Sequence, residues 1–260
     1  MSVDVDRWSD YLLDAVESRR AVRAITKQAD LSLEEAYAIQ EAAIDKRIGR
    51  GEKRIGAKLG LTSKAKQRQM GVEEPVYGWL TDRMQLPVEE PLRLAELIHP
   101  RCEPELVFHL NEDLAGPGVT AHDVLQATRA VTGGIEVIDS RYEAFSFTLP
   151  DVVADNTSAA RFVLGANRIG PTDADLALLG CLFEVNGELV DTAAGAALLG
   201  HPAASVARLA NHLGQRNQKL EAGWVVLAGG LTSAQHLQPG THVAVRYAHL
   251  GRVGLKAVES

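Results

Sequence analysis

Two predicted strands that carry glutamates constrain the fold of this chain more than any other feature. The strands cover residues 102–108 and 134–141, where apolar and β-branched residues alternate with other types. Successive side chains of a strand point to opposite faces, so Glu103 and Glu105 share one face and lie roughly 7 Å apart. Two carboxylates this close raise each other's pKa unless a cation lies between them. The first strand therefore presents a candidate cation-binding face.

A third glutamate, Glu136, lies on the second predicted strand and can supply another ligand. Three carboxylates with no histidine or cysteine among them suit a hard divalent cation such as Mg²⁺ or Mn²⁺, which leaves positions open for water and substrate. The alternative is that these glutamates lie on a solvated strand face or pair with arginines. The spacing of the residues leaves both interpretations open.

The segment between the two strands is predicted to be a helix. Thr120 and Asp123 provide its start signal, since a capping residue followed three positions later by an acid is typical of a helix N-terminus. The apolar and β-branched residues assigned to it are Val124, Leu125, Thr128 and Val131. A strand–helix–strand link would allow the two strands to lie side by side, which would bring Glu136 close to the other glutamates.

The N-terminal part of the chain is predicted to be helical. We expect helices over residues 5–20 and 32–51, the second with a capping box formed by Ser32 and Glu35 and an end at Gly51. A short polar helix is expected over residues 64–71. These segments define a helical N-terminal region, for which we take residues 1–75.

The remaining residues, 76–260, are expected to form a catalytic region built mostly of strands, within one structural unit. The clearest local signal is Asn186-Gly187 between two apolar runs, which predicts a type I′ hairpin over residues 181–191. A helix is expected to begin at Pro202. Further strands are predicted over residues 224–227, 243–247 and 253–257.

Composition narrows the class of protein. The chain has 260 residues and a hydrophobic fraction of 46%, enough for a sizeable core. Its net charge of −7 disfavours nucleic acid as a partner. The two cysteines, Cys102 and Cys181, lie far apart and form no C-x-x-C motif, which fits a reducing cytoplasm. No secretory signal and no apolar run long enough to span a bilayer is present, so we expect no membrane partner.

One lysine is a candidate for the active site. Lys58 lies in a segment of small and apolar residues punctuated by glycines, residues 55–63. A desolvated lysine beside a bound anion could hold a substrate carboxylate or an enolate. The alternative is a lysine whose ammonium extends to water.

Two further segments are candidates for substrate binding. Asp155 and Ser158 belong to a run of hydrogen-bonding residues that could equally be a capped turn. Arg161 follows, with a planar guanidinium suited to a carboxylate, or to a structural ion pair with an acidic neighbour such as Asp139 or Asp155. Thr232 belongs to a glycine-rich turn whose amides and hydroxyls could bind a carboxylate.

Taken together, these motifs resemble the hydratase/decarboxylase family of meta-cleavage pathways, within the fumarylacetoacetate-hydrolase-like superfamily. The resemblance covers almost the whole chain, and its motifs are residues 56–63, 70–72, 75–78, 99–105, 136–141, 153–156 and 200–202. It implies an α+β fold, a mixed β-sheet roll with a helical N-terminal part. It also implies Mg²⁺ or Mn²⁺ bound by Glu103, Glu105 and Glu136, with Lys58 in the active site.

Segments 139–147 and 152–162 look like the decarboxylase branch of this family. The resemblance therefore implies a carboxy-lyase that converts 2-oxo-3-hexenedioate (4-oxalocrotonate) to 2-hydroxypenta-2,4-dienoate in aromatic catabolism. In that reaction Arg161 is our candidate for orienting the second carboxylate of the substrate.

Two alternatives to this function remain open, and a third is disfavoured. The first is a hydratase acting on the dienoate product, and the second is a non-catalytic partner subunit of such a hydratase. A carbon–carbon hydrolase is disfavoured because no histidine–glutamate pair accompanies the metal motifs. The expected partners are a dicarboxylate substrate, further subunits in a homo- or hetero-oligomer, and a dienoate hydratase.

Overall fold

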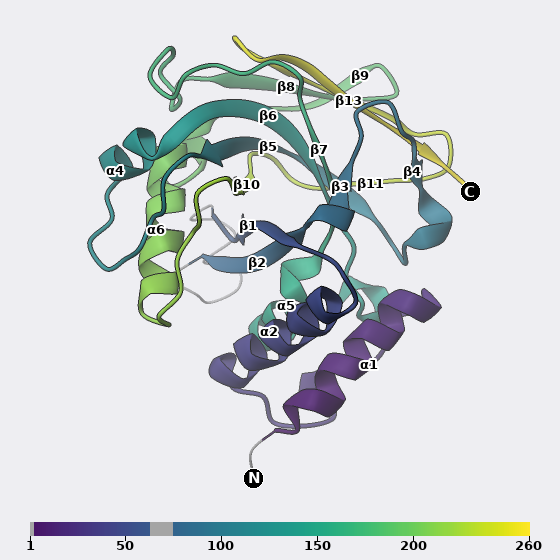
Figure 1. Ribbon diagram of the computed structural model, residues 1–260. Coiled ribbons are helices and arrows are strands. Elements are labelled where there is room, and N and C mark those ends of the chain that lie inside the picture. Colours follow the sequence, from purple (N-terminus) through teal and green to yellow (C-terminus); the bar gives the residue numbers. More distant parts are fainter. Residues whose placement is uncertain (1–2, 63–74) are drawn as a thin grey trace.

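The computed structural model describes residues 3–62 and 75–260, which form two curled β-sheets and a group of helices (Figure 1). The larger sheet has the order β2-β1-β10-β5-β6-β7-β3, with β11 paired to β5; the smaller has the order β4-β13-β12-β8-β9. Strands β1 and β10 are parallel whereas β5 and β6 are antiparallel, so the larger sheet is mixed. The predicted α+β fold with a mixed β-sheet roll is confirmed.

The bounds of the elements are as follows. The larger sheet consists of β1 Arg54–Gly60, β2 Val76–Thr81, β3 Gln85–Leu86, β5 Arg101–Leu110, β6 Thr128–Ile138, β7 Ala159–Leu164, β10 Val225–Gly230 and β11 Gln235–His236. The smaller sheet consists of β4 Leu92–Arg93, β8 Gly180–Val185, β9 Glu188–Ala194, β12 His242–Tyr247 and β13 Gly251–Val258. The α-helices are α1 Val5–Ser18, α2 Leu33–Gly49, α4 Ala121–Gln126, α5 Leu149–Ala154 and α6 Pro202–Gly214.

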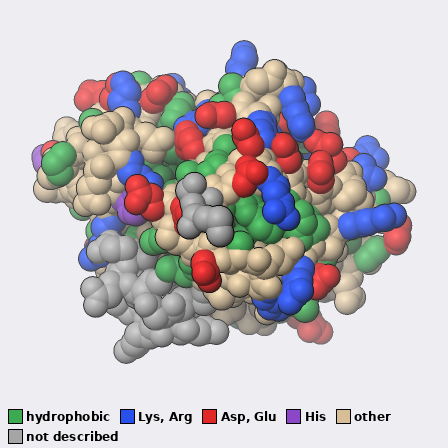
Figure 2. Space-filling model, turned by 90° about the horizontal axis from the view of Figure 1, so that it is seen from below, with side chains coloured by type: hydrophobic (Ala, Val, Ile, Leu, Met, Phe, Trp, Pro, Cys, Tyr) green, Lys and Arg blue, Asp and Glu red, His purple; other side chains and the backbone are tan. Residues whose placement is uncertain are grey.

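Helices α1 and α2 pack together on one side of the larger sheet (Figure 1). The capping box predicted for α2 is present, since Ser32 Oγ accepts from Glu35 N–H and Glu35 accepts from Ser32 N–H. On the face that these helices form, acidic and basic side chains are interspersed (Figure 2), and Lys46 pairs with Asp10 at 2.6 Å between the helices.

The predicted helical region of residues 1–75 is only partly helical. Strand β1 lies within it and pairs with β10 and β2 in the larger sheet, so the helical part ends with α2. Residues 56–59 of this strand are buried in an unbroken run, which is typical of a central strand covered on both faces. The boundary at residue 75 itself stays a prediction. The polar helix predicted for residues 64–71, and the motif at 70–72, lie outside the described residues.

The helix predicted between the glutamate strands is shorter than expected. It is α4, which keeps the capping box of Thr120 and Asp123 but ends at Gln126. Thr128 and Val131, which the sequence analysis assigned to it, belong instead to β6. Both residues are β-branched and pack better in a strand of the core than on a helix. The two glutamate strands, β5 and β6, are direct neighbours.

The smaller sheet covers the larger one and is pinned to it by Tyr247. The Tyr247 hydroxyl donates to the Gly134 carbonyl (2.6 Å) and accepts from Glu105 N–H (3.0 Å). Gly133 leaves room for the ring, because a Cβ there would lie 2.3 Å from Tyr247 Cδ2. In the same sheet, Asn186 and Gly187 have positive φ angles of 53° and 83°, so the predicted type I′ hairpin is confirmed. Among the described helices, none is long and apolar enough to cross a membrane.

Candidate active site

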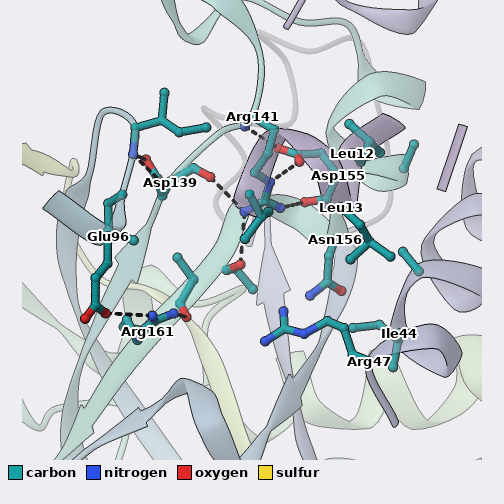
Figure 3. A pocket seen from close by; sticks show the side chains of 17 residues that line it. Leu12, Leu13, Ile44, Arg47, Glu96, Asp139, Arg141, Asp155, Asn156 and Arg161 are labelled. Atoms are coloured by element: carbon teal, nitrogen blue, oxygen red, sulfur yellow. Dashed lines mark hydrogen bonds and ion pairs between the residues drawn. The ribbon is translucent and has the colours of Figure 1, made fainter. Parts of the chain in front are cut away.

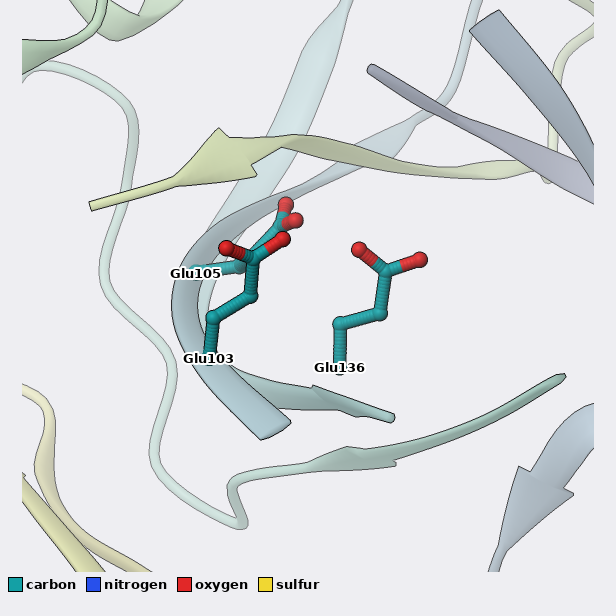
Figure 4. A group of neighbouring side chains, drawn as sticks. All are labelled: Glu103, Glu105 and Glu136. Atoms are coloured by element: carbon teal, nitrogen blue, oxygen red, sulfur yellow. The ribbon is translucent and has the colours of Figure 1, made fainter. Parts of the chain in front are cut away.

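Strands β5 and β6 bring three glutamates together (Figure 4). Glu103 lies directly opposite Glu136 in the antiparallel register, and Glu105 lies two residues further on the same face of β5. One carboxylate oxygen of each lies within 4.8 Å of the others. All three side chains are buried. We call these residues the glutamate cluster.

The glutamate cluster is electrostatically costly by itself. Burial raises the pKa of Glu105 well above its usual value, and the charges of Glu136 and Glu103 raise it further. Burial also raises the pKa of Glu136, although the charge of Lys58 opposes it. Glu105 Oε1 and both Glu136 oxygens accept no hydrogen bond from the described residues. Buried carboxylates with unsatisfied oxygens fit a divalent, oxygen-binding cation, which would balance their charge and fill their coordination.

Lys58 is a buried cation beside this cluster. Its side chain is 2% exposed, and its Nζ forms an ion pair with Glu136 Oε2 at 3.0 Å. The ammonium donates to the Thr157 carbonyl at 3.1 Å. Burial alone would lower the pKa of Lys58, but the charges of Glu136, Glu103 and Glu105 outweigh burial and raise this pKa. The alternative of an ammonium extended to water is therefore wrong.

The Thr157 carbonyl is presented by a left-handed turn, Asn156–Ser158. All three residues have φ between 49° and 57°, a region that costs energy for residues other than glycine. Asn156 compensates because its amide accepts from Trp79 N–H (2.7 Å) and donates to the Trp79 carbonyl (2.9 Å). Thr157 Oγ1 donates to the Tyr77 carbonyl at 2.7 Å. The turn is thus tied to β2 and fixes the direction of the Lys58 ammonium.

A cavity of about 550 Å³ adjoins the glutamate cluster. This volume lies in the range of pockets that bind small molecules. Its charged lining residues are Lys58, Glu103 and Arg101, and its lining hydroxyls include Ser158 and Ser233. Phe145 and Phe147 contribute apolar surface. The cavity therefore combines a cation-binding end with cationic and apolar walls, which suits an anionic substrate with a short carbon chain.

Similar proteins share both this sequence pattern and this fold. No family model matches the chain. A 4-oxalocrotonate decarboxylase of Pseudomonas sp. strain CF600 is 44% identical over 229 residues, which cover 88% of this chain and 87% of that protein. A 2-hydroxypent-2,4-dienoate hydratase of Pseudomonas putida is also 44% identical, over 81% of this chain and 96% of its own. The chain belongs to the hydratase/decarboxylase family.

Solved structures support the same membership. The 4-oxalocrotonate decarboxylase from Pseudomonas putida G7, complexed with magnesium and adipate, superposes with a TM-score of 0.95 and 39% identity, covering 98% of this chain and 97% of that one. A fumarylpyruvate hydrolase from Pseudomonas aeruginosa, at 16% identity and a TM-score of 0.62, shares the fold. The resemblance to this family that the motifs indicated is confirmed.

Within this family fold, the residues predicted for substrate binding are divided between two places. Ser158 lines the cavity beside Lys58. Thr232 is buried next to the lining residue Ser233, whose carbonyl accepts from Thr232 Oγ1 at 3.3 Å. Asp155 lies outside the cavity lining and forms a buried ion pair with Arg141. Burial raises the pKa of Asp155 to about 6, against the opposing charge of Arg141.

Arg161 does not lie with the glutamate cluster. On β7, the residue opposite Glu136 is Phe162, so Arg161 points to the other face of the sheet. There it pairs with Glu96 at 3.1 Å, beside a pocket of about 70 Å³ that Arg141 and Asp155 also line (Figure 3). A structural ion pair was one of the two predictions for Arg161, although its partner is neither Asp139 nor Asp155. Its position does not support a role in orienting the substrate.

The sequence analysis missed two residues of the site, Asn156 and Arg101. Asn156 could have been found from its type, because asparagine tolerates left-handed backbone and its amide can replace backbone hydrogen bonds. Arg101 could have been found from the alternation on β5, since it precedes Glu103 by two residues and shares its face.

Proposed function

We propose that this chain is a divalent-metal-dependent decarboxylase of 2-oxo-3-hexenedioate, 4-oxalocrotonate, in the catabolism of aromatic compounds. The observation that carries the proposal is the buried glutamate cluster with Lys58 at one end of a cavity of about 550 Å³. The relatives named as 4-oxalocrotonate decarboxylases, at 44% identity, support the same reaction. The bond that breaks joins C5 to C6, so that C6 leaves as CO₂ and its electron pair moves through the C3–C4 alkene to the C2 oxygen. A proton from solvent then gives 2-hydroxypenta-2,4-dienoate.

Glu103, Glu105 and Glu136 would hold the cation, for which we propose Mg²⁺ or Mn²⁺. When bound, this ion supplies a Lewis acid that lowers the energy of negative charge developing on the substrate. The carboxylates are fixed before substrate arrives, since all three are buried and Glu105 Oε2 accepts from Gly229 N–H at 2.8 Å.

Lys58 places a second positive charge at the same end of the cavity. The Thr157 carbonyl and Glu136 hold its ammonium, so it does not have to reorganise as the C2 oxygen becomes negative. In a buried site a fixed cation lowers the energy of such a charge much more than it would in water. We propose that Lys58 stabilises this oxygen and that Ser158, also in the lining, hydrogen-bonds the substrate.

The remaining predicted residues have supporting roles in this proposal. Asp155 holds Arg141, whose guanidinium also donates to the Asp139 carbonyl at 2.8 Å, and thereby supports the turn that carries Ser158. Thr232 supports the position of Ser233. A cytoplasmic location stays a prediction.

The direct experiment is to incubate the purified protein with 2-oxo-3-hexenedioate in Mg²⁺, in Mn²⁺ and in a chelator. We expect metal-dependent release of one CO₂ for each substrate consumed, with dienoate absorbance appearing at the same rate. Consumption of supplied dienoate without CO₂ release would favour the hydratase alternative, which the 44% identical hydratase keeps in view. Stabilisation by metal with neither reaction would favour the non-catalytic partner subunit.

We also propose that the protein forms an oligomer, either with further copies of itself or in a complex with a dienoate hydratase. A decarboxylase and a hydratase are each 44% identical to this chain, which supports a shared assembly of the two kinds of subunit. Co-expression of the two chains followed by analytical ultracentrifugation tests this assembly. Separate sedimentation of the two proteins at micromolar concentration would contradict it.

A further inference from the structure

Arg101 begins the strand that carries the glutamate cluster. It alternates with Glu103 and Glu105 on β5 and therefore shares their face, opposite Ile138 of β6. Two residues of strand separate its Cα from that of Glu103 by about 7 Å. Its side chain lines the same cavity as Lys58 and Glu103. The cavity thus has a second cation, on the same strand face as Glu103 and Glu105 and one strand repeat from Glu103.

The guanidinium of Arg101 lacks an acidic partner among the described residues. Its Nε is buried and has no hydrogen-bond partner there, while its Cζ lies 3.9 Å from the centre of the Phe145 ring. Burial lowers the pKa of Arg101. Arg141 and Arg161 differ in this respect, because the first pairs with Asp155 and the second with Glu96. Arg101 is therefore a cation whose guanidinium stacks on an aromatic ring and whose Nε has no hydrogen-bond partner among the described residues.

We propose that Arg101, stacked on Phe145, binds the second carboxylate of the substrate and so selects dicarboxylates over monocarboxylates. This inference rests on the proposed function. The planar guanidinium can donate two parallel hydrogen bonds to one carboxylate, which a lysine at this position could not do. Phe147 and Ile138 also line this cavity and offer apolar surface to the hydrocarbon part of the substrate.

The chemistry explains why this cation lies apart from Lys58. The second carboxylate is the group that leaves as CO₂ and loses its charge, so a very strong ion pair with it would stabilise the substrate more than the transition state. A guanidinium that is only partly buried orients the carboxylate while holding it less firmly than the buried Lys58 would. Arg101 is therefore expected to affect KM more than kcat.

The experiment compares Arg101→Gln and Arg101→Lys with Arg161→Gln as a matched control. The probes are two saturated, unreactive analogues, 2-oxoadipate and 2-oxohexanoate, titrated calorimetrically into the Mg²⁺-loaded protein. Both contain the 2-oxo acid, but only 2-oxoadipate has the second carboxylate. Mg²⁺ affinity and melting temperature are measured for each variant, so that a folding defect is recognised.

We expect Arg101→Gln to weaken binding of 2-oxoadipate by roughly 10–100-fold, the range for hydrogen bonds to a charged group. Binding of 2-oxohexanoate should stay within about twofold. Arg101→Lys should recover only part of the loss, and Arg161→Gln should change neither probe.

Three results would overturn the inference: equal weakening of both probes by Arg101→Gln, no weakening of either, or a selective loss in Arg161→Gln. Failure of the proposed function looks different. A wild-type protein that releases no CO₂ from 2-oxo-3-hexenedioate contradicts the proposed reaction, whatever the Arg101 variants bind. Wild-type decarboxylation with unselective Arg101 variants contradicts only the subsite.

Discussion

Replacing Lys58 by methionine tests the electrostatic balance of the site. Lys58 Nζ lies 3.0 Å from Glu136 Oε2, and the two side chains are 2% and 1% exposed. Removing one partner of a buried ion pair costs about 3–5 kcal/mol, because the other charge remains buried without compensation. In a protein of this size each kcal/mol lowers Tm by about 2–4 °C, so the metal-free variant should melt about 6–20 °C below the metal-free wild type.

Added metal should reduce this difference. A ligand at 100 times its Kd stabilises the folded state by about 2.7 kcal/mol. A divalent cation held by the glutamate cluster would be repelled by the Lys58 ammonium, and Lys58→Met would remove this repulsion. Mg²⁺ should therefore raise the Tm of the variant more than that of the wild type. Turnover should nevertheless fall by roughly 10²–10³-fold, the usual cost of losing one fixed electrostatic group.

The assay is differential scanning calorimetry in a chelator and in saturating Mg²⁺, with Lys219→Met as the control. Lys219 pairs with Asp113 at 2.5 Å, but both side chains are about half exposed, at 46% and 45%. Exposed pairs contribute about 0–1 kcal/mol, so the Tm of the control should shift by at most about 4 °C. If metal-free Lys58→Met melts with the wild type, or if Mg²⁺ stabilises both proteins equally, the electrostatic reasoning is wrong.

Three further predictions follow from the site and the core. Glu105→Gln removes a carboxylate whose negative charge is disfavoured by burial and by two neighbouring carboxylates. The metal-free variant should therefore melt at a higher temperature than the metal-free wild type, whereas its affinity for Mg²⁺, measured by calorimetry, should fall at least about tenfold. Asn156→Ala removes the two hydrogen bonds to Trp79 and leaves alanine in a left-handed turn. Urea unfolding should show that the free energy of unfolding falls by about 2–4 kcal/mol, and kcat should fall more than KM rises. An unchanged kcat would show that other groups hold Lys58 in place. Burial lowers the pKa of His109 to about 4, below the value of about 6.5 in the unfolded chain. The contribution of neutral His109 to the free energy of unfolding is therefore fully present above pH 6.5, and about 3 kcal/mol of it is lost as the pH falls towards 4. In His109→Gln, Tm should depend less on pH over that range.

Local patterns predicted the elements of this fold well. The alternation around Glu103 and Glu105, the capping box of Ser32 and the Asn186-Gly187 turn each depend on neighbouring residues, and all appear in the structure. The link between the two strands suggested that Glu136 could lie near the other two glutamates, and the family resemblance implied that all three bind one cation. The C-terminal end of α4 was misjudged, because Thr128 fits the spacing of a helix but belongs to β6.

The errors in the candidate site concern the face on which a side chain lies. Arg161 follows the turn that lines the cavity, so its nearness in sequence suggested the same site. Strand β7 alternates, and only its register with β6 shows that Phe162, not Arg161, lies opposite Glu136. Arg101 was missed for the complementary reason, since the sequence does not show which arginines have acidic partners. Contacts between distant residues decide both points.

The phenol of Tyr247 links distant parts of the chain. Its single oxygen bonds to Glu105, 142 positions away, and to Gly134, 113 positions away. One side chain of β12, an element of the other sheet, therefore hydrogen-bonds to both glutamate strands. Contacts so remote in sequence form late, because closing large loops costs entropy before any contact is gained. Tight binding of the cation would then require that the smaller sheet has packed onto the larger one, so metal affinity measured during refolding would follow the completion of folding.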